Sequence, residues 1–391
     1  MSIHIVKLDN NSKNEWDDFV KSQPHANVHQ LAGWSGIIER AYHHKTYYLM
    51  AVEKYPTILR HTVPEPFNMA AKNHNSRGEG KKPDRRIIGI LPLIHLKHFL
   101  FGNGLISIPF FDVGGILTDS KDAEKKLLEE SIRLAIELKA DFVELRHAIP
   151  LSSLEKSEKI RLDKDNLSVN LGKKSYKVQM LMRLPDSAES LMNSFKSKLR
   201  SQIKKPIKEG LSTKVGQSEL LADFYTVFAQ NMRKLGSPVH SKYFIRNAIK
   251  EYSDDSKIFV IYKNDKPAAA SLVVGFKGIL KNPWSSSLRE FSRMAPNMLL
   301  YWKMLEYACD NKYRIFDFGR STPGEGTFKF KEQWGASSAP LYWYYMYLLK
   351  KPREHSIAQN SKFEVLSRVW KRLPLSLTNF MGPKIRKYIS L

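Results

Sequence analysis

The feature that most constrains the fold is a short strand pattern that occurs twice, once in each half of the chain. DFVELRH at 141–147 and RIFDFGR at 314–320 both run apolar, apolar, acid, apolar, and reach an Arg within the next two positions. Each copy follows a helical stretch of similar length and is followed by a Pro-containing turn. The matched order of elements indicates an internal duplication, with two α/β units built in the same way. We therefore expect an α/β (α+β) chain whose two tandem domains are each a mixed sheet flanked by helices.

The length of the chain, 391 residues, suits two domains of ordinary size. We assign residues 1–170 to an N-terminal domain and residues 171–350 to a C-terminal catalytic domain. Within the first domain, a stretch rich in Pro, Gly, Asn and charge predicts a mobile insertion at about 54–86, between two strands.

Residues 351–391 form a basic tail in which charges alternate with large apolar residues. From Lys350 to Leu391 the chain holds ten Lys or Arg and two acids, Glu354 and Glu364. Such an amphipathic stretch can lie on an anionic membrane surface. It can equally be a basic helix packed on the second domain, because the pattern alone does not separate a core-facing stripe from a lipid-facing one. Both interpretations stay open.

The charge balance points to anionic partners. Lys and Arg number 63 against 39 Asp and Glu, which gives a net charge of +24. A phosphorylated substrate, an RNA such as tRNA, and the inner face of a bilayer all fit this excess. The charge does not choose among them.

Cysteine usage and hydropathy predict a cytoplasmic protein. Cys309 is the single cysteine, which excludes a disulfide framework and fits a reducing compartment. The N-terminal segment has no apolar h-region, and the longest apolar runs fall short of the ~20 residues that span a bilayer. Peripheral contact with the inner face of the cytoplasmic membrane remains an alternative. The histidines are spaced loosely, so we expect no metal site.

A predicted helix at 186–210, which Pro206 ends or kinks, carries a cluster of cations without an acid among them. Such a run is ordinarily a solvated helix face. The alternative is a surface that holds a phosphate beside the active cleft. Arg200 and Lys204 are the candidates for that role.

The segment FDFGRSTPGEGTFKFKEQWG, residues 316–335, carries the richest chemistry. It begins as a strand and delivers Arg320 and Ser321 at the strand's carboxyl end, where substrates of α/β sheets bind. Pro323, Gly324 and Gly326 then predict a tight reversal, whose backbone N–H groups can face a ligand.

The side chains around this turn fit acyl transfer. Lys331 can offer a cation to a developing oxyanion. Asp317 or Glu332 can accept a proton from an attacking amine. Arg320 would anchor the substrate, and Trp334 would shield the cleft from water. A glycine turn with ion-paired charges explains the same residues, and the chemistry alone does not separate the two interpretations.

The combined motif FDFGRS…GTF.FK.QWG, preceded by W.SS.R…PN.LLYW, resembles the FemAB-like branch of the GNAT acyltransferase superfamily. The resemblance extends over nearly the whole chain and is closest to the FemAB-type proteins associated with exosortase (PEP-CTERM) exopolysaccharide loci. The residues that carry it are Trp284, Ser286, Arg289, Pro296, Asn297, Tyr301, Trp302, Asp317, Phe318, Gly319, Arg320, Ser321, Phe330, Lys331, Trp334 and Gly335.

The resemblance implies two tandem GNAT-like domains. It also implies acyl or aminoacyl transfer to an amine or hydroxyl of a cell-envelope or exopolysaccharide precursor, either an anionic saccharide or a lipid-linked one. By position, the functional Lys of the family is Lys331. Candidate substrate-binding residues are Trp284, Ser286, Arg289, Asn297, Tyr301 and Trp334. The alternative is a non-catalytic module of the same fold that binds an anionic lipid-linked glycan or RNA.

The acyl donor stays open at the level of sequence. GNAT enzymes that use acetyl-CoA carry a glycine-containing loop before a helix, which holds the pyrophosphate on backbone amides. The matching segment here, SRMAPNMLLYW, has no glycine. We expect no tightly bound cofactor, with acyl-CoA and aminoacyl-tRNA as the donors to be tested.

Overall fold

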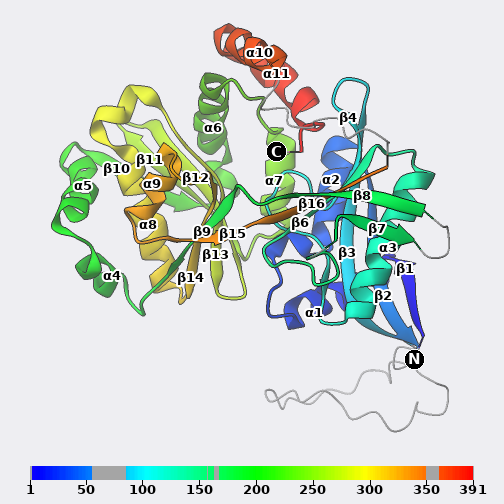
Figure 1. The fold of residues 1–391 in the computed structure, drawn as a ribbon. Helices are drawn as coiled ribbons and strands as arrows, with labels where there is room; N and C mark the ends of the chain where they lie inside the picture. Colours follow the sequence, from blue (N-terminus) through cyan, green and yellow to red (C-terminus); the bar gives the residue numbers. More distant parts are fainter. Residues whose placement is uncertain (1, 55–84, 156, 163–166, 349–360, 391) are drawn as a thin grey trace.

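Two mixed β-sheets form the body of the molecule, with helices packed on their faces (Figure 1). The computed structural model describes residues 2–54, 85–155, 157–162, 167–348 and 361–390. In Figure 1 the first sheet lies on the right and the second on the left. The predicted α/β class, with two mixed sheets flanked by helices, is confirmed.

The first sheet has nine strands, in the order β1-β2-β3-β4-β6-β16-β8-β7, with the short β5 paired to β3. Its strands are β1 (Ile3–Lys7), β2 (Lys45–Lys54), β3 (Arg85–His98), β4 (Gly102–Ile106), β5 (Leu117–Thr118), β6 (Phe142–His147), β7 (Lys159–Leu162), β8 (Leu167–Lys174) and β16 (Tyr342–Tyr347). The helices of this half are α1 (Lys13–Ser22), the short 3₁₀ turn η1 (Val28–Gln30), α2 (Gly33–Tyr42) and α3 (Lys121–Glu137). The insertion expected at about 54–86 lies, apart from its ends, outside the described residues.

The second sheet has seven strands, in the order β10-β11-β12-β13-β14-β9-β15. Its strands are β9 (Val178–Arg183), β10 (Leu211–Gly216), β11 (Ser256–Lys263), β12 (Lys266–Phe276), β13 (Ile279–Ser287), β14 (Ile315–Ser321) and β15 (Ser337–Pro340). The helices and 3₁₀ turns of this half are α4 (Ala188–Ser194), α5 (Ser197–Lys208), η3 (Ser218–Leu220), α6 (Leu221–Leu235), α7 (Lys242–Glu251), η4 (Arg289–Met294), α8 (Pro296–Asp310) and α9 (Gly326–Glu332).

The two sheets repeat one arrangement, as the strand pattern predicted. In each, the strand that carries the repeated motif follows a helix and pairs in parallel with a strand that precedes that helix in the chain: β6 follows α3 and pairs with β4, and β14 follows α8 and pairs with β13. Glu144 lies opposite Ile106 in the first sheet, and Asp317 lies opposite Lys281 in the second, at the last pair of each parallel ladder. The acids of the two motif copies therefore occupy equivalent positions.

Each sheet is completed by a strand from outside its own run of sequence. β9 follows directly after β8 in the chain, yet it pairs between β14 and β15 in the second sheet. β16 follows β15, yet it pairs between β6 and β8 in the first sheet. A boundary at residue 170 therefore cuts β8, and a second domain that ends at 350 includes a strand of the first sheet. This exchange ties the two halves together.

Apolar layers separate the elements. α3 covers one face of the first sheet, and α4, α5 and α8 cover the outer face of the second (Figure 1). Between the sheets lie α2 and α7, which pack against each other, together with α6. An aromatic cluster fills this junction, in which Trp34 contacts Phe111 and Phe244, and both of these contact Trp284.

The helix predicted over 186–210 is in fact two helices, α4 and α5. Ser187, with extended backbone, caps α4 by accepting a hydrogen bond from the Ser190 N–H at 3.1 Å. The chain leaves the helix at Phe195, whose ring is buried against Trp302 and Trp334. Burial of this aromatic outweighs the local helical tendency. Pro206 lies in the last turn of α5, where the helix ends two residues later.

The tail forms two helices, α10 (Ser361–Arg372) and α11 (Leu375–Arg386), which we call the C-terminal hairpin. Both pack on α6, and Arg233 Nη1 donates to the Leu373 carbonyl at 3.0 Å. The end of the chain reaches the junction between the sheets, where the Phe110 N–H donates to the Ser390 carbonyl at 2.6 Å. The part of the tail that the structure describes is thus docked on the protein.

Candidate active site

The second sheet opens where its two parallel strands separate. β13 and β14 pair only from Ile279 with Ile315 to Lys281 with Asp317, although both strands continue further. On its other edge, β14 stays paired with β9 through a bulge between Asp317 and Arg320. The gap between β13 and β14 therefore begins at the acidic residue of the motif.

Asp317 lies at the head of this gap and is almost fully buried. Its carboxylate accepts hydrogen bonds from Lys281 Nζ at 2.7 Å, from Gln179 Nε2 at 2.5 Å and from the Gly319 N–H at 2.8 Å. Gly319 has φ +75°, a left-handed conformation that favours glycine, and this turns its N–H back toward the acid. Three donors, one of them the buried Lys281 ammonium, hold the Asp317 carboxylate in place.

Lys331 projects from α9 into the same region and is 8% exposed. Its Nζ donates to the carbonyls of Gly319 at 3.2 Å and Arg320 at 2.9 Å. Burial lowers the pKa of Lys331 to about 8, although the nearby carboxylates of Asp317 and Asp112 act in the opposite direction. An ammonium has three donors, so these two carbonyls leave one N–H for a further acceptor.

Arg320 links the gap to the first half of the chain. Its Nε lies 3.4 Å from Oδ1 of Asp112, a residue of the loop between β4 and β5. Its guanidinium also lies over the Trp343 ring of β16, 5.3 Å from the ring centroid. Arg146 of β6 lies over the same ring at 4.6 Å. The exchanged strand and the first-half loop therefore both contribute to the site.

The equivalent place in the first sheet is filled by the protein's own chain. Glu144 pairs with Arg146 at 2.7 Å, as Asp317 pairs with Lys281. Here, however, the Ser107 N–H donates to the Glu144 carbonyl, and the N–H groups of Gly114 and Gly115 donate to the Arg146 carbonyl. The 107–115 segment thus closes the first gap and carries Asp112 toward the second. This asymmetry places the candidate site in the second sheet.

The other predicted residues fall into three groups. The side chains of Tyr301 and Trp334 are buried in the core of the second half and contact each other. Trp334 also contacts the Phe195 ring, and Tyr301 contacts the Phe330 ring. Trp334 therefore does not shield a cleft from water. Trp284 lies in the aromatic junction, and Ser286 accepts from Asn231 Nδ2 at 3.1 Å. Ser321 is buried at the end of β14, and its hydroxyl has no hydrogen-bond partner among the described residues.

The remaining candidates form no hydrogen bond or ion pair with Asp317 or Lys331 among the described residues. Glu332 on α9, Arg289 on η4 and Lys204 on α5 have exposed side chains, and Asn297 is half-buried in the first turn of α8. Arg200 caps the break between α4 and α5, where its Nη1 donates to the Phe195 carbonyl at 3.0 Å. Lys204 thus faces solvent, whereas Arg200 is engaged by the protein's own backbone, and a phosphate-binding role for α5 stays a prediction.

Sequence reasoning missed Asp112, Lys281 and Gln179. A signal was present for two of them: Asp112 is an acid inside the apolar segment PFFDVGG, and Lys281 interrupts the apolar strand GILKNPW. A lone charge within a buried strand requires a partner of opposite sign, which identifies such positions. Gln179 gives no comparable signal.

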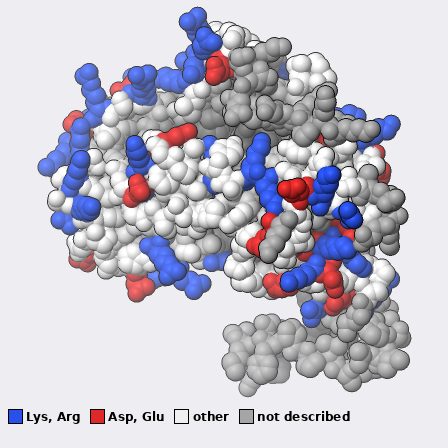
Figure 2. All heavy atoms as spheres, in the orientation of Figure 1, with Lys and Arg blue, Asp and Glu red and all other residues white. Residues whose placement is uncertain are grey.

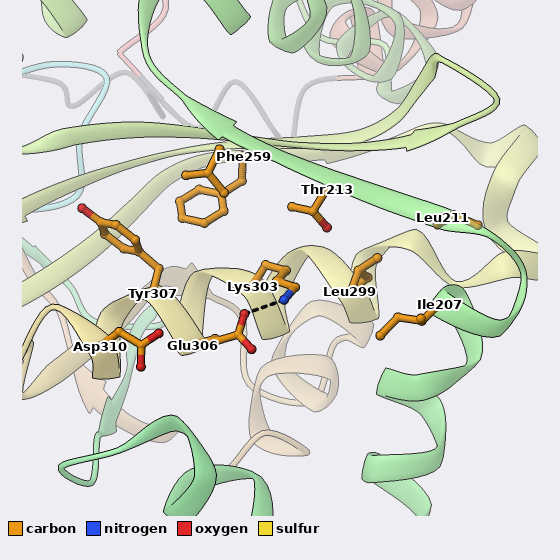
Figure 3. A pocket seen from close by; sticks show the side chains of 10 residues that line it. Ile207, Leu211, Thr213, Phe259, Leu299, Lys303, Glu306, Tyr307 and Asp310 are labelled. Atoms are coloured by element: carbon orange, nitrogen blue, oxygen red, sulfur yellow. Dashed lines mark hydrogen bonds and ion pairs between the residues drawn. The ribbon is translucent and has the colours of Figure 1, made fainter.

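A separate hollow of about 540 Å³ lies on the other face of the second sheet (Figure 3). It is bounded by α8, by the end of α5 and by β10, and Lys303 and Glu306 form an ion pair of 2.6 Å within it. Its lining includes Leu211, Phe259 and Leu299 and none of the predicted site residues. Because none of the predicted site residues lines this hollow, we do not assign the site there.

Within the described ranges, no three His, Cys, Asp or Glu side chains are placed to hold a metal ion. The described helices also include none that is both long and apolar enough to cross a bilayer.

Comparison with known proteins agrees with this geometry. Residues 193–332 match the family model described as acetyltransferase (GNAT) domain. The second half of the chain carries a GNAT domain. The match includes Lys281, Asp317, Arg320 and Lys331 of the site, whereas Asp112 lies outside it. The run β1-β2-β3-β4-β6 of the first sheet corresponds to the run β10-β11-β12-β13-β14 of the second, so the fold consists of two tandem GNAT-like units.

Two solved structures resemble the chain over most of its length. The crystal structure of FemX is 15% identical with a TM-score of 0.58, covering 87% of this chain and 96% of that chain. A conserved protein of unknown function from Bacteroides thetaiotaomicron is 8% identical with a TM-score of 0.53, covering 88% of this chain and all of the other. At these identities the likeness concerns the fold. No curated protein matches the sequence.

Proposed function

We propose that this chain is an acyl- or aminoacyltransferase of the FemAB/GNAT type, which acts on a cell-envelope or exopolysaccharide precursor. The observation that carries the proposal is the buried Lys331 ammonium beside the gap between β13 and β14, with two donors fixed on backbone carbonyls and a third not used by them. A cation held in this way stabilises negative charge that develops on an acyl carbonyl oxygen.

In the proposed reaction, the amine or hydroxyl of the acceptor attacks the donor carbonyl, and the carbonyl oxygen becomes an oxyanion beside Lys331. The attacking group loses a proton to a nearby base. The leaving group, a thiol of acyl-CoA or a ribose hydroxyl of tRNA, takes up a proton as it departs. Either donor is anionic, which fits the excess of Lys and Arg on the surface shown in Figure 2.

Asp112 is the better candidate for the base than the two acids expected from the sequence. Asp317 is buried and already accepts hydrogen bonds from Lys281, Gln179 and a backbone N–H, and Glu332 has an exposed side chain on α9. Asp112 approaches the gap from the first half and is partly exposed. Its ion pair with Arg320 would hold it in place, and Arg320 would also attract an anionic group of the acceptor.

The function is tested by mass spectrometry of nucleotide-linked, lipid-linked and polymeric saccharides from cells that lack this chain. We expect one saccharide pool to lose the mass of an acyl or aminoacyl group, and wild-type chain to restore it. Restoration by a Lys331→Ala chain would favour the non-catalytic binding module. Unchanged saccharide masses in the deletion strain would contradict the proposed function.

The pH dependence of transfer tests the charge of Lys331. Because its pKa is about 8, the ammonium is the main form at neutral pH and is lost above pH 8. If the cation acts, kcat/KM falls by about tenfold per pH unit above that value. A Lys331→Arg enzyme keeps its charge, so its weaker activity should show no decline near pH 8. A rate that rises through pH 8 in the wild type would instead identify the neutral amine as a base.

A further inference from the structure

The C-terminal hairpin presents large apolar side chains to solvent. The exposed residues are Val365, Leu366 and Val369 on α10, and Leu377, Phe380 and Met381 on α11. Leu366 is 59% exposed and Phe380 is 65% exposed. Their spacing of three or four residues places them on one side of each helix.

These side chains are not the ones that dock the hairpin on the protein. Trp370 on α10, and Thr378, Gly382 and Arg386 on α11, are buried. Arg386 Nε donates to His240 Nε2 at 3.2 Å in the junction between the sheets. The hairpin therefore has a packed stripe and a second apolar stripe that faces outward. An outward apolar stripe on a helix that is already docked indicates a further interaction.

A second element extends this outward face. The turn between β3 and β4 carries Phe99, which is 88% exposed, and Leu100, which is 68% exposed. The turn lies beside the end of the hairpin, because the His98 ring is 4.4 Å from that of Tyr388. In Figure 1 the β3–β4 turn and the hairpin both lie along the upper edge of the molecule. Two distant parts of the sequence thus expose apolar groups on the same edge.

Cations accompany the apolar side chains. Arg368, Lys371, Arg372 and Lys384 are exposed on the hairpin, and Lys97 is exposed beside the turn. Lys384 Nζ lies 3.8 Å from the centre of the Phe380 ring. Among the hairpin side chains that the structure describes, Glu364 is the single acid. Figure 2 shows Lys and Arg at the outer end of this edge, next to uncharged surface.

We propose that this edge, the hairpin together with the β3–β4 turn, docks on a lipid bilayer that contains anionic lipids. Phe99, Leu100 and Phe380 would enter the boundary between headgroups and acyl chains, and the cations would contact anionic headgroups. The charge composition favours a bilayer over a second copy of this chain, because two such edges would bring like charges together.

Docking would also serve the proposed function, on which this consequence rests. The Ser390 carbonyl accepts from the Phe110 N–H, two residues before Asp112, so the docking edge continues into the site. A lipid-linked acceptor in the bilayer would then reach the gap between β13 and β14 without leaving the membrane. Membrane binding itself needs no transfer activity and can be measured separately.

The experiment is flotation of the full-length chain with vesicles of phosphatidylcholine alone, or with about 30% phosphatidylglycerol. We expect binding to the anionic vesicles that weakens with added salt. The Phe380→Ser variant and the Phe99→Ser/Leu100→Ser variant should each lower the partition coefficient by at least about fivefold. The control is Ile207→Ser on α5, an aliphatic residue that is 53% exposed on another side of the molecule, which should float as the wild type does.

Two further measurements separate the possible failures. Lys331→Ala should float normally, so loss of transfer with retained flotation would concern the site alone. Absence of wild-type flotation with anionic vesicles, or flotation that the three edge substitutions leave unchanged, would overturn the proposal. A dimer in solution that Phe380→Ser converts to a monomer, without vesicle binding, would assign the edge to self-association instead.

Discussion

Replacement of Lys331 by Ala is expected to lower kcat for acyl transfer by about 10²–10³-fold, the usual effect of removing one oxyanion donor. The reason is that Lys331 is a buried cation beside the gap between β13 and β14, and it is paired with backbone carbonyls, whereas Lys281 is paired with the Asp317 carboxylate. The substitution removes charge stabilisation that exists mainly in the transition state, so KM should change little.

The control for this substitution lies on the same helix. Lys329 is exposed on α9, so Lys329→Ala removes an equal charge without touching the gap and should keep near-normal turnover. Steady-state kinetics of the three enzymes make the comparison. Equal losses in the two variants would show that only the charge of α9 matters, and an active Lys331→Ala enzyme would remove the lysine from the mechanism.

Stability should respond differently from activity. The pKa of Lys331 falls from 10.5 to about 8 on folding, so the unfolded chain binds the proton more tightly. Below pH 8, where Lys331 is protonated in both states, this difference lowers the free energy of unfolding by about 3 kcal/mol. As the pH rises from 8 to 10.5, the folded chain releases the proton first, and the free energy of unfolding rises by the same amount. Lys331→Ala removes this cost together with two hydrogen bonds. We expect little change in Tm at pH 7, which separates loss of chemistry from loss of fold.

The second large effect concerns the buried ion pair at the head of the gap. Lys281→Met is expected to lower the free energy of unfolding by about 3 kcal/mol, because it leaves the Asp317 carboxylate buried without its counter-charge. Gln179 and the Gly319 N–H would still donate to Asp317, but neither carries a charge. Urea denaturation, followed by circular dichroism, measures the change.

Two comparisons sharpen this prediction. Lys266→Met at the exposed start of β12 should change the free energy of unfolding by less than about 0.5 kcal/mol. The double variant Lys281→Met/Asp317→Leu removes both charges and should recover a large part of the loss, since apolar replacement of a whole buried pair is often tolerated. A loss below about 1 kcal/mol in Lys281→Met would mean that Asp317 takes up a proton or gains water.

The candidate site combines residues that the sequence could and could not bring together. Lys331, Asp317 and Arg320 belong to one segment of 15 residues, so a local pattern of strand, glycine turn and charge singled them out as candidates. Asp112 and Lys281 come from other parts of the chain and meet that segment only after folding. The role of Trp334 was ambiguous, because an aromatic residue beside a turn can line a cleft or fill a core. In the structure, Trp334 packs against Phe195 and Tyr301 and belongs to the core.

By itself, the sequence determined that the chain repeats one α/β unit and that the segment 316–335 contains the candidate lysine, Lys331. These features follow from residue periodicity and local turn chemistry, which act over neighbouring positions. Only the tertiary structure decided that β9 and β16 exchange sheets, that the 107–115 segment closes the first gap, and that Asp112 faces the second. The physical reason is that strand pairing joins residues that are far apart in the chain. A strand's alternation of apolar and polar side chains is the same in either sheet, so the sequence pattern does not reveal which sheet the strand joins.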